Sequence, residues 1–113
     1  MPHIVIEYAQ SLDTALDLNA LVKAVHEGAI RTGLFEPEAV KVRAIAYHHY
    51  LVAGQVSDFV HLRAHILSGR SEQQKKSLGL CLMESASAVA ACVSSLTVEV
   101  VDMDRHSYAK RLL

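Results

Sequence analysis

The chain opens with Met1-Pro2-His3-Ile4-Val5-Ile6-Glu7-Tyr8. Period-two alternation and β-branched residues after Pro2 are typical of a β-strand. Proline is well tolerated at the first residue of a strand, where it removes no ladder hydrogen bond. We therefore expect a strand that begins directly after Pro2.

Pro2 also has the chemistry of a catalytic base. If Met1 is removed, as a small second residue permits, Pro2 becomes a free secondary amine, whereas with Met1 attached its nitrogen is an amide without basicity. A prolyl amine is intrinsically basic, but burial in an apolar pocket beside cations disfavours its charged form. Such an amine is neutral near pH 7 and can accept a proton. The alternative is that Pro2 only starts the strand.

The composition fits a single packed domain. The chain has 113 residues, of which 51% are hydrophobic, within the usual size of one domain. Its 11 basic and 12 acidic residues nearly cancel, whereas nucleic-acid-binding proteins normally carry a basic excess. We expect no nucleic-acid partner, and an anionic ligand would need a local cluster of cations. Because we find no signal peptide and no run of about 20 apolar residues, we expect no membrane segment and a cytoplasmic location.

The first half of the chain reads as strand, helix, strand. Thr14 and Asp17 form a helix-start signal, and Gly33, followed by Pro37, is a natural helix end. Residues 40–47 then alternate as a second strand. The apolar residues of the helix repeat at helical spacing and are expected to face a sheet: Leu18, Leu21, Val22, Val25 and Ala29.

The second half repeats this order. A turn at Ala53-Gly54 leads to a strand over residues 59–67. Ser71 and Gln74 form a capping box for a second helix, and residues 96–103 alternate as a last strand. A short polar tail runs from there to the end of the chain.

The pattern predicts an α+β fold made of two βαβ pseudo-repeats. We expect one domain over residues 1–113, with halves at about 1–52 and 53–104 and a short C-terminal tail. A crossover helix in each half implies two parallel strands, giving a four-stranded sheet covered on one face by two helices. The other face mixes charged and apolar residues, and we expect other subunits to bury it.

Four motifs occur together in a characteristic order: Met1-Pro2-His3 with Glu7, Thr32-Gly33-Leu34-Phe35, Phe59-Val60-His61, and Gly69-Arg70-Ser71. In this order and spacing, from Met1 to about Met103, the chain resembles the 5-carboxymethyl-2-hydroxymuconate isomerase family of the tautomerase superfamily. The resemblance implies a fold like that of macrophage migration inhibitory factor. It also implies a homotrimer with a central barrel of sheets, six surrounding helices and an active site near each Pro2, at subunit boundaries.

The resemblance further implies the reaction. An enol or dienol would be converted to the conjugated keto form within an unsaturated polycarboxylate of homoprotocatechuate (4-hydroxyphenylacetate) catabolism, without a metal or organic cofactor. Pro2 would take the proton from the 2-hydroxy group and return it at carbon. Cations would hold the small carboxylate substrate and stabilise the developing oxyanion.

Three cations are the candidate substrate-binding residues. Arg70 and Arg43 match arginines of the family. Lys41 stands where the family typically has arginine, so the charge is kept but the planar two-donor fork is lost, which affects substrate orientation. The tail after Met103 is also shorter than is usual in the family.

A structural role competes with ligand binding for the strand cations. Lys41, Arg43 and Arg63 can pair across strands with Glu7 and Glu99, on the sheet face away from the helices. Arg70 differs, because a glycine-flanked loop beside a helix N-terminus favours an anion.

Two other functions remain open: a trimeric binding protein that has lost the chemistry, and a related tautomerase acting on another unsaturated acid. A metal site is not expected among the seven histidines. His61 and His65 on one strand would lie about 13 Å apart, too far to share an ion.

Overall fold

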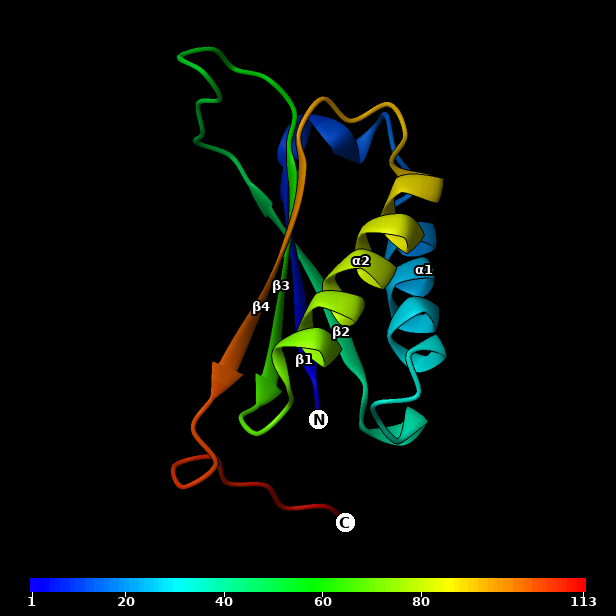
Figure 1. The fold of residues 1–113 in the computed structure, drawn as a ribbon. Coiled ribbons are helices and arrows are strands. Elements are labelled where there is room, and N and C mark those ends of the chain that lie inside the picture. The colour runs from blue at the N-terminus through cyan, green and yellow to red at the C-terminus, as the bar shows by residue number, and fades with distance from the viewer.

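The computed structural model describes residues 1–113 and confirms the α+β fold with two βαβ units (Figure 1). One four-stranded sheet has the strand order β2-β1-β3-β4. The elements in chain order are β1 (His3–Ala9), a 3-10 turn (Gln10–Asp13), α1 (Leu18–Arg31), a second 3-10 turn (Pro37–Ala39), β2 (Lys41–Tyr47), β3 (Val60–Leu67), α2 (Glu72–Val89) and β4 (Leu96–Met103).

Strand pairing confirms the expected parallel pairs. β1 runs parallel to β2, and β3 runs parallel to β4. The two units meet through the antiparallel pair β1 and β3. The starts of β1 and β2 therefore lie at the same end of the sheet as the ends of β3 and β4 (Figure 1).

Both helices cover the same face of the sheet (Figure 1). Successive strand residues point to opposite faces, and the even-numbered residues of β1 and β3 point toward the helices. Neither helix is long and apolar enough to cross a membrane. The largest fully buried core side chains from strands and helices are Ile4, Ile6, Val60, Leu62, Ile66, Leu21, Val25, Leu78 and Leu82.

The predicted start of α2 is confirmed, but that of α1 is wrong. Ser71 Oγ accepts from Gln74 N at 3.1 Å, and the Gln74 side chain accepts from Ser71 N at 2.8 Å. At α1 the N-cap is Asp17, which accepts from the backbone of Ala20. Thr14 instead ends the 3-10 turn after β1, which forms because it buries Leu12 against the core.

Both predicted glycine positions at chain reversals are confirmed. Gly33 follows α1 with φ of +71°, the left-handed conformation that glycine adopts without strain. Ala53 and Gly54 both have positive φ, and Val52 and Gln55 on either side exchange backbone hydrogen bonds of 2.7 and 3.0 Å. This turn lies at the tip of an arm between β2 and β3 that projects from the sheet (Figure 1).

The close contact between the helices predicts that a larger residue at position 28 destabilises the fold. A Cβ there would lie 2.2 Å from Ser85 Oγ and 2.9 Å from Ser85 Cβ. We expect Gly28→Ala to lower the free energy of unfolding by about 1–3 kcal/mol, as overpacking does. The matched control is Gly79→Ala in α2, whose Cβ would meet only Val100 at 3.8 Å and which should stabilise by up to about 1 kcal/mol. Urea unfolding measures both, and equal stabilities would refute the close helix contact.

Candidate active site

Pro2 lies at the start of the central strand β1, and its ring is fully buried. Its carbonyl oxygen accepts from the backbone N–H of Lys41 at 3.1 Å, continuing the pairing of β1 with β2. The amine of Met1 donates to the carbonyl oxygen of Ala39 at 2.5 Å. The N-terminus is therefore fixed beside the start of β2.

Burial and neighbouring positive charges both act on the amine of Met1. The pKa of the Met1 amine is lowered from its ordinary value, first by burial and then by the charges of Lys41 and Lys110. Each of these disfavours the protonated form. The Met1 amine is thus shifted toward its neutral, proton-accepting form.

Three hollows that share Met1 surround the terminus. Their volumes are about 350, 240 and 80 Å³. Arg70 and Phe35 line both the largest and the smallest, and Lys110 lines the two larger ones. Met1 therefore sits at the centre of one indented region at this end of the sheet.

Four cations border these hollows, and backbone carbonyls anchor three of them, Arg70, Lys41 and Arg105. Arg70 donates to the carbonyl oxygen of Leu34 at 2.5 Å, and its guanidinium lies 5.5 Å from the centre of the Phe35 ring, within cation–π range. Lys41 Nζ donates to the Ala39 carbonyl oxygen at 3.2 Å. The four cations are Lys41, Arg70, Arg105 and Lys110.

None of these four cations is neutralised by an ion pair. The ion pairs of the chain involve other residues: His61, Arg63 and Lys75 with Glu7, Glu99 and Asp102. Glu36 and Glu38 also line the hollows, so cations exceed carboxylates there by two. A cation-rich indentation without ion pairs is suited to an anion that carries several carboxylates.

Arg43 does not line the hollows that Lys41 and Arg70 border. Pro2, Lys41 and Arg70 lie around Met1, but Arg43 lies on the open face of the sheet, where Nη1 contacts His3 Nδ1 at 3.3 Å. The expected pairing with Glu7 and Glu99 is confirmed for Arg63, at 3.9 and 3.1 Å. It is wrong for Lys41 and Arg43, which bind Ala39 and His3 instead.

The sequence predicted no role for the His3 side chain, which joins the open face of the sheet to the tail. A guanidinium can only donate, so Nδ1 of His3 accepts from Arg43 and the proton of the neutral ring sits on Nε2. Nε2 lies 2.9 Å from the hydroxyl of Tyr108 and donates to it. Burial, followed by the charges of Arg43 and Lys41, lowers the pKa of His3, which keeps the ring neutral at pH 7.

The tail supplies the other residues that the sequence did not reveal. Arg105, Tyr108 and Lys110 all reach the N-terminal end of β1. The tail has no periodic pattern, so nothing in it predicts where it folds. The only signal was its density of cationic and aromatic residues within 105–111.

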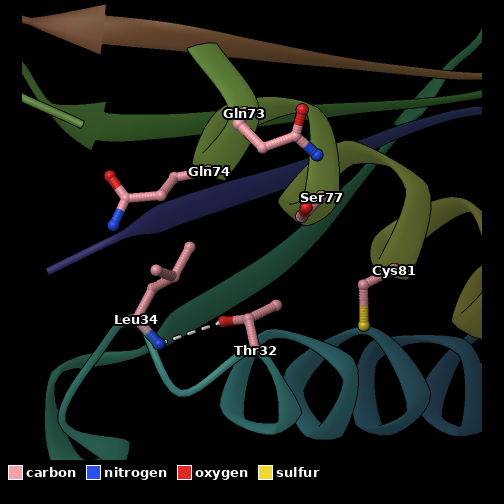
Figure 2. Close-up of a pocket in the computed structure, with 6 residues that line it drawn as sticks. All are labelled: Thr32, Leu34, Gln73, Gln74, Ser77 and Cys81. Atoms are coloured by element: carbon pink, nitrogen blue, oxygen red, sulfur yellow. Dashed lines mark hydrogen bonds between the residues drawn. The ribbon is translucent and has the colours of Figure 1, made fainter. Parts of the chain in front are cut away.

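The largest cavity lies between the end of α1 and the start of α2 and shares Leu34 with the largest of the three hollows (Figure 2). It measures about 390 Å³, and the Leu34 N–H bonds the Thr32 hydroxyl at its edge. No charged side chain lines it, so it is not suited to a polycarboxylate. Its lining residues are Thr32, Leu34, Gln73, Gln74, Ser77 and Cys81.

Solved structures with the same architecture define the class as a tautomerase fold. A 5-carboxymethyl-2-hydroxymuconate delta-isomerase is 22% identical, with a TM-score of 0.83 over 99% of this chain and 88% of that chain. The corresponding isomerase from Deinococcus radiodurans R1 is 25% identical, with a TM-score of 0.86 over 97% and 88%. A fused 4-OT described as a symmetric trimer is 18% identical, with a TM-score of 0.78 over 96% and 90%.

The sequence profile of 5-carboxymethyl-2-hydroxymuconate isomerase matches residues 2–111. The chain therefore belongs to the 5-carboxymethyl-2-hydroxymuconate isomerase family and is an isomerase, as the resemblance of its motifs predicted. Comparison with curated protein sequences gave no match.

The geometry around His3 predicts its titration. We expect His3 to titrate below the ordinary histidine range, and Arg43→Gln to raise its pKa because a neighbouring cation disfavours the protonated ring. NMR titration of the histidine side chains measures this. Arg31→Gln, on the helix side of the sheet, is the control and should leave His3 unchanged. A His3 pKa that does not respond to Arg43→Gln would contradict the contact.

Proposed function

We propose that Pro2, freed of Met1, is the base of a 5-carboxymethyl-2-hydroxymuconate delta-isomerase. The observation that carries this proposal is the position of Pro2, which is buried at the start of β1 and directly follows Met1, the residue shared by the cation-lined hollows. Family membership supports the reaction class. The proposed substrate is an unsaturated polycarboxylate from homoprotocatechuate catabolism.

Removal of Met1 is a condition of this proposal. While Met1 is attached, the Pro2 nitrogen is an amide and cannot accept a proton. Met1 lines all three hollows, so its loss would join them and open them to the Pro2 nitrogen. The new amine would meet the burial and the cations that lower the pKa of the Met1 amine.

The proton transfer divides into two steps. The neutral Pro2 amine takes the proton of the 2-hydroxy group, and the electron pair of the O–H bond forms the carbonyl while the conjugated double bonds shift. The prolinium then gives the proton to carbon, which restores the amine. No net oxidation occurs, and a base whose pKa lies near the working pH serves both steps.

The cations are assigned to binding and charge stabilisation. Arg70, fixed by the Leu34 carbonyl and the Phe35 ring, holds one substrate carboxylate. Lys41 holds a second with a single ammonium rather than a fork. Arg43 contributes to substrate binding from the open face of the sheet, where other subunits are proposed to pack. Their positive charge also stabilises the oxyanion that develops as the enol loses its proton.

A homotrimer would bury the uncovered face of the sheet. Ile45 and Tyr47 on β2 are 53% and 40% exposed in the single chain, and the Arg63 ion pairs lie on the same face. Relatives of the same fold are described as symmetric and asymmetric trimers. The division into halves at residues 1–52 and 53–104 fits such an assembly, with two βαβ units per subunit.

Catalysis should depend on the free Pro2 amine. In a spectrophotometric assay of 5-carboxymethyl-2-hydroxymuconate ketonisation, we expect turnover to scale with the Met-free fraction measured by intact mass. Pro2→Ala, also processed to a free amine, should lower kcat by about 10²-fold, since positioned general bases contribute at least that much.

Pro37→Ala is the matched control, because this proline lies outside the hollows around Met1. Equal turnover by Met-retaining and Met-free protein would refute Pro2 as the base. No turnover by a Met-free trimer would instead point to another unsaturated acid, with Lys41 as the first residue to exchange for arginine.

The assembly is tested separately by light scattering. We expect the mass of three chains of 12.4 kDa each, because burial of the open face favours association. Ile45→Glu, placed on that face, should shift the protein toward monomers. A stable wild-type monomer would contradict the proposed assembly.

A further inference from the structure

The C-terminal tail turns back under the end of the sheet that holds Pro2 (Figure 1). A turn starts the reversal, with Ser107 N donating to the Asp104 carbonyl at 3.3 Å. Arg105 Nε then donates to the carbonyl oxygen of Ser68, just past the end of β3. The tail thus leaves the edge strand β4 and first attaches beneath β3.

The next attachment lies beneath β1. Tyr108, which is partly buried, bonds His3 at 2.9 Å, and the two rings pack at a centroid distance of 5.9 Å. The residues joined are 105 positions apart in sequence. Because both a hydrogen bond and a ring contact hold Tyr108, the segment that follows it is directed toward the N-terminus.

This path of the tail places Lys110 beside Met1. Lys110 lines the two larger hollows beside Met1, and its charge lowers the pKa of the Met1 amine. It forms no ion pair with Glu36, which lines the same hollows. Lys110 and the neighbouring Arg111 are both exposed, but Arg111 lines none of the three hollows.

We propose that the tail is part of the substrate site: Lys110 binds a substrate carboxylate beside the N-terminal amine, and Tyr108 positions it through His3. This inference rests on the proposed isomerase function. It adds a third carboxylate-binding cation to Arg70 and Lys41, which matches a substrate with three carboxylates. Lys110 is a substrate-binding residue, and Tyr108 is a positioning residue.

We expect substitutions of Lys110 and of Tyr108 to change KM by different amounts. A cation that holds a carboxylate, rather than the reacting oxygen or carbon, contributes to substrate and transition state alike, so its loss raises KM and leaves kcat nearly unchanged. Loss of the Tyr108 hydroxyl frees the tail and weakens the same contact indirectly. The two effects should therefore not add, because they act through one interaction.

The first experiment compares Lys110→Gln with Arg111→Gln in Met-free protein. Each variant removes one positive charge from the tail, at adjacent positions. We expect Lys110→Gln to raise KM for 5-carboxymethyl-2-hydroxymuconate about tenfold, as loss of one charge-assisted hydrogen bond does. Arg111→Gln should leave KM within about twofold, since Arg111 lines none of the hollows and a charge without contact to the substrate is screened by salt. An equal effect of both substitutions would overturn the proposal.

The second experiment tests positioning. Tyr108→Phe should raise KM by less than Lys110→Gln does, with kcat unchanged. The double variant should match Lys110→Gln alone. Additive effects, or a fall of kcat with Tyr108→Phe, would overturn the positioning role. Unchanged thermal unfolding and light scattering exclude loss of fold or assembly as the cause.

A binding measurement separates this inference from the proposed reaction. Calorimetric titration with propane-1,2,3-tricarboxylate, a saturated tricarboxylate, needs no turnover. If wild-type protein does not turn over the substrate but binds this probe about tenfold more tightly than Lys110→Gln does, the isomerase proposal fails and the tail site stands. If turnover is normal and the probe affinity does not differ between Lys110→Gln and Arg111→Gln, the tail inference fails alone.

Discussion

The pairing of β1 with β2 on one side and β3 on the other is the constraint on which the site depends. β1 runs parallel to β2 and antiparallel to β3, and β4 follows the direction of β3. At one end of the sheet, therefore, two strands start and two strands end. Pro2, the start of β2, the loop before α2 and the tail meet there because of this topology, although they lie far apart in sequence.

Burial at this end gives the site its electrostatic character. The core side chains of β1 hold the strand against the helices, which fixes Pro2 inside the protein rather than at a free terminus. Around it, Lys41 and Arg70 use backbone carbonyls, not carboxylates, as their partners. Carbonyls orient the cations without cancelling their charge. Burial, followed by the charges of Lys41 and Lys110, lowers the pKa of the Met1 amine.

The sequence predicted those features that depend on local patterns. The structure confirms the alternating strands, the Ser71 capping box and the turn at Gly33. The helix start predicted at Thr14 is wrong because the residues before it form a 3-10 turn that buries Leu12. This is a tertiary effect that no local signal carries. For the same reason the role of Tyr108 was missed, since its partner His3 is at the other end of the chain. Arg43 lies on the open face of the sheet, where it contacts His3, and its role in substrate binding stays a prediction.

The most direct measurement is a ¹⁵N NMR titration of Met-free protein labelled at proline. The chain has two prolines, and the Pro37 nitrogen is an amide that does not titrate, so the single titrating signal belongs to Pro2. The account predicts a pKa below that of an ordinary prolyl amine, coinciding with the acid limb of kcat/KM, which reports groups of the free enzyme. A Pro2 amine that stays protonated throughout the pH range of full activity would contradict it.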